Sequence, residues 1–188
     1  HLDPFFINIM NEVKELLKKT FKTDSNFTIA LPGTGTAGME AAICNLVEEG
    51  DQVVVGQNGY FGARLSEIVS RYGGQVIPVN TEWGKPIMKE DIEAALKNSK
   101  AKIIAIVHAE TSTGVLQPIE EISRLTKSYG AILLLDAVTS LGGCRLKVDE
   151  MDVDICYSAT QKCLNCPPGL SPITVSEKAF ESIRNRRT

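Results

Sequence analysis

The sequence predicts one α/β domain of three layers (αβα), in which helices cover both faces of a mostly parallel sheet. Its apolar runs, such as 103–107 and 131–135, are almost uninterrupted and of strand length, as in strands buried on both faces of a parallel sheet. These runs alternate with segments of helical periodicity that glycine or proline ends. A chain of 188 residues suits one sizeable domain, and no repeat, linker or low-complexity segment interrupts it.

The first predicted element is a helix. Asp3 is suited to the N-cap and Pro4 to the first helical position. Apolar residues such as Phe5 and Ile9 then recur at helical spacing, so we expect the helix to reach about Phe21.

Strands and helices alternate along the rest of the chain. Runs of β-branched and apolar residues predict strands at 27–31, 53–55, 75–79, 102–107, 131–135 and 153–157. Helical spacing predicts helices after the glycine-rich segment 33–38, over 61–72, from about 89, over 118–129 and after a Ser176 cap.

Composition excludes several classes of function. A net charge of −3 and a pI near 5.5 give no basic surface for nucleic acid, and the apolar runs are too short to span a membrane. Five cysteines, an odd number, favour buried free thiols in a reducing compartment. We therefore predict a cytoplasmic protein, with organellar targeting left open. Cys163-x-x-Cys166 lacks a second pair and the chain has two histidines, so no metal site is predicted.

The unusual residues follow the predicted strands. They lie at 33–38, 108–114, 136–143 and 158–162. Ligands of open parallel sheets bind beyond the carboxyl ends of the strands. The sequence therefore predicts a ligand site at that edge.

The segment from Gly33 to Gly38 matches G-x-G-x-x-G between a predicted strand and a helix. Free N–H groups at a helix N-terminus bind phosphate. A dinucleotide site also needs an acid at the end of the next strand, but Val55 is followed by Gly56, Gln57 and Asn58. This favours a smaller phosphorylated cofactor, although a simple tight turn stays open.

Asp136 and Lys162 complete a set of three features. A carboxylate that ends the apolar run 132–135 is costly unless a cation or several donors meet it. A protonated pyridine nitrogen would be such a cation, and the N–H groups of the next turn are the alternative. Lys162 as a neutral amine, favoured by burial near positive charge, forms an imine with an aldehyde; a solvent-facing lysine is the alternative. Pyridoxal phosphate needs all three features.

Three segments together resemble the class V aminotransferases. They are 158–164 with Pro167-Pro168-Gly169, then 136–143, and 108–118. Within that family the chain is most similar to the branch of alanine–glyoxylate and serine–pyruvate or serine–glyoxylate aminotransferases. The resemblance runs almost end to end. It implies the large domain of pyridoxal-phosphate enzymes of fold type I, with a mostly parallel seven-stranded sheet, and a homodimer.

The resemblance also implies the roles of individual residues. Lys162 would form the Schiff base and move the proton, and Asp136 would meet the pyridine nitrogen, as the two catalytic residues. Family members often have histidine at Thr36, and tryptophan is also common at Phe61. The implied cofactor-binding residues are Thr34, Gly35, Thr36, Phe61, Thr111, Asp136, Val138, Ser140, Gln161 and Lys162.

The resemblance places residues 1–188 in the cofactor-binding large domain. It implies that the family's N-terminal arm and C-terminal small domain lie outside this chain, together with the arginine that pairs with the substrate carboxylate. We therefore expect the segment alone to be inactive. The expected reaction of the whole enzyme is transamination of alanine or serine with glyoxylate or pyruvate as acceptor.

Three alternatives stay open. A cysteine desulfurase would use the same cofactor, but that group usually has histidine where Gln161 stands. A nucleotide-binding domain without pyridoxal phosphate would use 33–38 and leave Asp136 and Lys162 unexplained. A catalytically silent scaffold would not explain a full set of cofactor residues.

Overall fold

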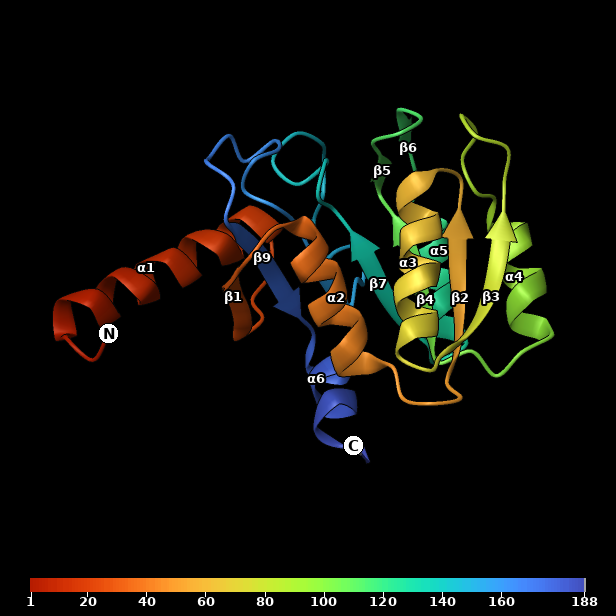
Figure 1. Cartoon of the computed structure of the whole chain (residues 1–188), viewed down its shortest axis with the longest axis horizontal. Helices are drawn as coiled ribbons and strands as arrows, with labels where there is room; N and C mark the ends of the chain where they lie inside the picture. The colour runs from red at the N-terminus through yellow and green to blue at the C-terminus, as the bar shows by residue number, and fades with distance from the viewer. Residues whose placement is uncertain (188) are drawn as a thin grey trace.

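The computed structural model describes residues 1–187, and Thr188, the last residue of the predicted domain, lies outside them. A seven-stranded sheet in the order β1-β9-β8-β7-β4-β2-β3 forms the middle layer (Figure 1). Its neighbouring strands are parallel except where β9 pairs with β1 and β8. The strands are β1 Phe27–Pro32, β2 Gln52–Gln57, β3 Gln75–Asn80, β4 Ile103–Val107, β7 Ile132–Asp136, β8 Ile155–Tyr157 and β9 Leu170–Val175.

Helices cover both faces of the sheet, which confirms the predicted three layers. α2 (Gly35–Leu46), α3 (Tyr60–Arg71) and α6 (Glu177–Arg184) pack on one face. α4 (Lys89–Lys97) and α5 (Glu120–Ser128) pack on the other.

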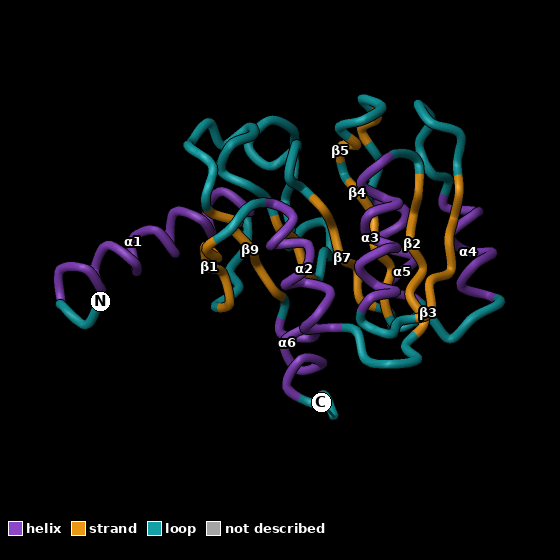
Figure 2. The backbone as a smooth tube through the Cα atoms, viewed as in Figure 1, coloured by secondary structure: helices purple, strands orange, loops and turns teal. Residues whose placement is uncertain are grey.

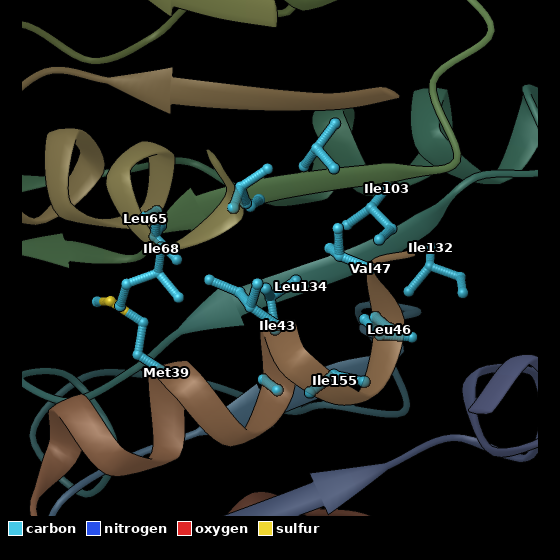
Figure 3. Packing of buried hydrophobic residues seen from close by; sticks show 14 of the residues in the cluster. Met39, Ile43, Leu46, Val47, Leu65, Ile68, Ile103, Ile132, Leu134 and Ile155 are labelled. Atoms are coloured by element: carbon cyan, nitrogen blue, oxygen red, sulfur yellow. The ribbon is translucent and has the colours of Figure 1, made fainter. Parts of the chain in front are cut away.

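Each face of the sheet has its own apolar core, because side chains alternate along a strand. Val53 and Val55 of β2 join the first core, and Val54 between them joins the second. Figure 3 shows the first core, where Met39 and Ile43 of α2 lie against the strands. Burying one such side chain contributes about 1.5–3 kcal/mol. The two cores hold the sheet rigid beneath the loops that follow its strands.

α1 (Pro4–Phe21) begins as predicted, since Asp3 Oδ1 accepts a hydrogen bond from Phe5 N at 2.9 Å. The helix projects from the body of the molecule (Figure 1), and Phe21 is its one buried residue. No helix within residues 1–187 is both long and apolar enough to cross a membrane.

β9 is absent from the sequence prediction because Pro172 argues against a central strand. The structure shows how the proline is tolerated. Pro172 O accepts from Ser158 N at 2.8 Å. Because the N and O atoms of one residue in an antiparallel strand face the same neighbour, the proline nitrogen also faces Ser158. Pro172 cannot donate to Ser158 O, and Ser171 Oγ donates to that oxygen at 2.7 Å instead, just beyond the end of β8 at Tyr157.

Some predicted boundaries were also wrong. α2 begins at Gly35, so the second half of the glycine-rich segment is helical, and α5 begins at Glu120 rather than Pro118. A short hairpin of β5 (Ala109–Glu110) and β6 (Val115–Leu116) was not predicted. Figure 2 shows long loops above the upper ends of β7 and β3, the edge where the ligand site is expected.

Candidate active site

A cavity of about 250 Å³ opens at the carboxyl edge of the sheet. Segments that are far apart in the sequence line it: the start of α2, the first turns of α3, the end of β7 and the turn after β8. Every predicted cofactor residue except Thr111 and Ser140 is in this wall, and two residues that were not predicted join them. The lining residues are Thr34, Gly35, Thr36, Met39, Phe61, Arg64, Asp136, Val138, Gln161 and Lys162.

The N-terminus of α2 forms one wall. Thr34 is the N-cap, and its side chain makes no capping hydrogen bond. The first N–H groups of a helix have no acceptor within the helix, and the helix dipole makes this end positive. Gly35 lies so close to the opposite wall that a Cβ there would stand 2.8 Å from Val138 Cγ2 and 3.2 Å from Ala159 Cβ. This wall is suited to an anion.

Asp136 ends β7 and is buried. Its Oδ1 accepts from Val138 N at 2.9 Å, and its Oδ2 accepts from Tyr157 OH at 2.8 Å. Burial nevertheless raises the pKa of Asp136 to about 6, because these two donors only partly offset the loss of water. The turn N–H considered as an alternative is thus present, and the carboxylate still favours a cation nearby.

Tyr157 is the partner that sequence reasoning missed. It ends β8 directly opposite Asp136 in the parallel register, and its side chain is buried. Burial and the neighbouring Asp136 raise the pKa of Tyr157 well above its ordinary value. The hydroxyl therefore keeps its proton and acts as a donor to the carboxylate.

Phe61 and Arg64 lie on the first turns of α3. Phe61 is half-buried and packs against the first core. Arg64 Nη1 donates to Thr36 Oγ1 at 3.2 Å, and Nη2 donates to Tyr60 OH at 2.9 Å. The guanidinium carbon is 5.1 Å from the centroid of the Tyr60 ring and 6.0 Å from that of Phe61. Arg64 therefore bridges the N-terminal turns of α2 and α3.

Glu110 holds the start of α3 in place. α3 has Gly59 at its N-cap and no side-chain cap of its own. Buried Glu110, from β5, accepts through Oε2 from Phe61 N at 3.1 Å and Gly62 N at 3.3 Å. Its Oε1 accepts from Ser112 N and Oγ at 3.1 and 2.8 Å. The hairpin thus caps the helix from outside and sets the position of Phe61.

Lys162 lies on the turn that follows β8. Asn165 N donates to Lys162 O at 2.9 Å, which closes the turn. The turn stands at the rim of the cavity, and both Gln161 and Lys162 are exposed, so the side chain of Lys162 faces solvent as the alternative reading expected. The position still lets the side chain line the same cavity as Asp136 and Thr34.

Thr111 and Ser140 lie outside the residues that line the cavity. Thr111 is exposed, with Oγ1 at 3.5 Å from Thr139 Oγ1. Ser140 is buried, and its Oγ lies 2.9 Å from Nδ1 of His108, a histidine whose pKa is lowered by burial. The cofactor roles of Thr111 and Ser140 stay predictions.

The cysteines are less buried than expected. Cys156 is buried, Cys44 and Cys144 are half-buried, and Cys163 and Cys166 are exposed because they lie on the loop after β8. No group of three or more His, Cys, Asp or Glu side chains able to hold a metal occurs in residues 1–187.

Known proteins resemble this chain along almost its whole length. A family model described as aminotransferase class-V matches residues 1–187. The (S)-ureidoglycine–glyoxylate transaminase of Bacillus subtilis (strain 168) is 40% identical over 185 residues, which cover 98% of this chain and 44% of that protein. The alanine–glyoxylate aminotransferase of Drosophila melanogaster is 40% identical over 189 residues, which cover 100% of this chain and 48% of that protein.

A solved structure is also similar over the whole chain. The crystal structure of alanine–glyoxylate aminotransferase from Nostoc sp. superposes with a TM-score of 0.98 at 47% identity, covering 100% of this chain and 50% of its own. The chain spans about half the length of the curated relatives it matches.

Proposed function

This chain belongs to the class-V aminotransferase family, and from that premise we propose that the full-length protein is a pyridoxal-phosphate-dependent transaminase. Its amino acceptor is glyoxylate, the oxo acid that the names of the B. subtilis, D. melanogaster and Nostoc relatives share. Its donor is a small amino acid, alanine or serine, and pyruvate is the alternative acceptor.

One observation carries this proposal. The open N-terminus of α2, the buried Asp136 carboxylate and the Lys162 side chain line the same 250 Å³ cavity. The donor set suits the cofactor: neutral N–H and hydroxyl groups for a phosphate, a carboxylate whose burial favours a cation, and a primary amine for an aldehyde.

The bound cofactor supplies an electron sink that stabilises negative charge on the substrate carbon. The protein's own residues bind and orient it. The N-terminal N–H groups of α2 with the hydroxyls of Thr34 and Thr36 bind the phosphate, and Phe61 packs on the ring face. Asp136 accepts a hydrogen bond from the ring nitrogen, which offsets the cost of burying the carboxylate.

Lys162 has two tasks. Its Nζ would hold the cofactor as an imine, and its amine would move a proton from the α-carbon of the substrate to the former aldehyde carbon of the cofactor, across the nitrogen that joins them. Its place at the exposed rim lets the amine reach a substrate that enters from solvent.

Transamination by the full-length protein tests the proposal. We expect alanine and glyoxylate to give pyruvate and glycine in equal amounts, and Lys162→Ala to abolish both products. Release of sulfide from cysteine, with no glycine formed from glyoxylate, would favour the desulfurase alternative instead. If folded, cofactor-saturated protein catalysed neither reaction, both kinds of pyridoxal-phosphate enzyme would be refuted.

We further propose a homodimer in the cytoplasm. Leu2 before the projecting helix α1, and Phe5 and Leu16 within it, are exposed, with 77%, 74% and 53% of their surfaces accessible. A second copy would remove this apolar surface from water. Light scattering of the full-length protein measures the mass, and a monomer would contradict the dimer.

A further inference from the structure

Arg64 has more hydrogen-bonding capacity than the protein uses. A guanidinium has five N–H donors. Its Nη1 and Nη2 donate to the hydroxyls of Thr36 and Tyr60, and both acceptors are neutral. No carboxylate in residues 1–187 forms a salt bridge with Arg64. A half-buried cation that lines a cavity without an anionic partner is available to an anionic ligand.

The charges around the cavity narrow the choice of ligand group. Lys162 and Arg64 are the two cationic side chains in its wall, and Asp136 is the one acid. In the proposed function Lys162 holds the aldehyde, and the Asp136 carboxylate pairs with the positively charged ring nitrogen of the cofactor. The remaining groups near Thr34 and Thr36 are neutral donors, although a phosphate monoester carries close to two negative charges at neutral pH.

We propose that Arg64 binds the phosphate group of the cofactor, together with the N-terminal turn of α2. This inference rests on the proposed function. Because Arg64 Nη1 lies 3.2 Å from Thr36 Oγ1, a phosphate bound by that hydroxyl is a neighbour of the guanidinium. The Thr36 oxygen accepts from Arg64, so its own hydrogen is free to point at a phosphate oxygen.

The position of Arg64 is fixed before a ligand arrives. The hydrogen bond to Tyr60 OH and the contact with the face of the Tyr60 ring restrict the side chain. A preorganised guanidinium loses little conformational entropy on binding an anion. A substrate carboxylate has the same anionic chemistry, so the test must separate the two ligands.

The test compares pyridoxal phosphate with pyridoxal, which lacks the phosphate. Dissociation constants of both are measured by absorbance on cofactor-free, full-length protein. We expect Arg64→Gln to weaken binding of pyridoxal phosphate by roughly 10- to 100-fold, the effect of a charge-assisted hydrogen bond. Binding of pyridoxal should change by less than about twofold, and Arg64→Lys, which keeps the charge, should have an intermediate effect.

Arg71→Gln is the matched control. Arg71 lies on the same helix, is exposed and pairs with Glu67 at 2.6 Å, so both affinities should match the unsubstituted protein. Circular dichroism melting of Arg64→Gln shows whether the variant is folded.

Equal weakening of both ligands, or of neither, would overturn the inference. Unchanged affinity for pyridoxal phosphate with a raised KM for the amino acid would assign Arg64 to the substrate carboxylate and overturn it as well. If the unsubstituted protein bound neither ligand, the proposed function would fail first and this inference with it. If the unsubstituted protein bound pyridoxal phosphate tightly and Arg64→Gln bound it equally well, this inference would be refuted and the proposed function would stand.

Discussion

Replacing Asp136 by asparagine should stabilise the cofactor-free protein at neutral pH. Burial raises the pKa of this carboxyl from its ordinary 3.8 to about 6. Between these values the folded state keeps a proton that the unfolded state loses, so stability falls as pH rises through this window. Above about pH 6 the ionised, buried carboxylate costs about 3 kcal/mol, at 1.36 kcal/mol per pH unit.

Asp136→Asn removes that cost because the amide does not ionise. Its oxygen can still accept from Val138 N, and the Tyr157 hydroxyl can turn to accept from the amide N–H. We expect the variant to be more stable by up to about 3 kcal/mol at pH 8 and nearly equal at pH 4. Its transaminase activity should be lost, because the ring nitrogen has no anionic partner.

Urea unfolding of the cofactor-free, full-length protein at pH 4, 6 and 8 measures the difference. Asp91→Asn on the exposed surface of α4, away from the cavity and from α1, is the control. A variant that is less stable than the unsubstituted protein at pH 8, or a difference that is constant with pH, would refute this reasoning.

Three further substitutions test other walls of the cavity. Gly35→Ala places a Cβ 2.8 Å from Val138 Cγ2 and should cost about 1–3 kcal/mol of stability in urea unfolding; no loss would contradict the tight packing there. Glu110→Gln should lower stability by about 1–3 kcal/mol, because the start of α3 loses charged acceptors; an unchanged thermal melt would show that the helix does not need this cap. Phe61→Leu should weaken cofactor binding by about 0.5–1.5 kcal/mol through loss of ring stacking, measured by equilibrium dialysis, and an unchanged affinity would remove Phe61 from the ring site.

Local sequence patterns predicted the central strands and the edge of the sheet at which the site lies. The apolar runs 103–107 and 131–135 form central strands, with bounds that shift by a residue. Strand ends also predicted which segments meet, because parallel strands bring their carboxyl ends to one edge. Asp136, Lys162 and Thr34 do line one cavity there.

Residues whose roles depend on tertiary contacts were missed. Tyr157 reaches Asp136 from 21 positions away, and Glu110 reaches Phe61 from 49 positions away. Nothing in either local pattern gives those partners. Arg64 had a usable signal, since it follows Phe61 by three residues and so lies on the same face of the helix.

The sequence left the exposure of Lys162 open, because the path of the chain after a strand is not set by the strand itself. The chain turns at the end of β8, and Asn165 N closes that turn on Lys162 O. The turn places the side chain at the rim of the cavity rather than beneath it.

The bond between Lys162 and the cofactor is the central claim, and borohydride reduction tests it most directly. The full-length protein is saturated with pyridoxal phosphate, reduced, digested and mapped by mass spectrometry, with Lys162→Ala treated in parallel. We predict a stable adduct on the peptide that contains Lys162 and none at that position in the variant. A folded, saturated protein with no adduct, or with its adduct on another lysine such as Lys102, would contradict the account.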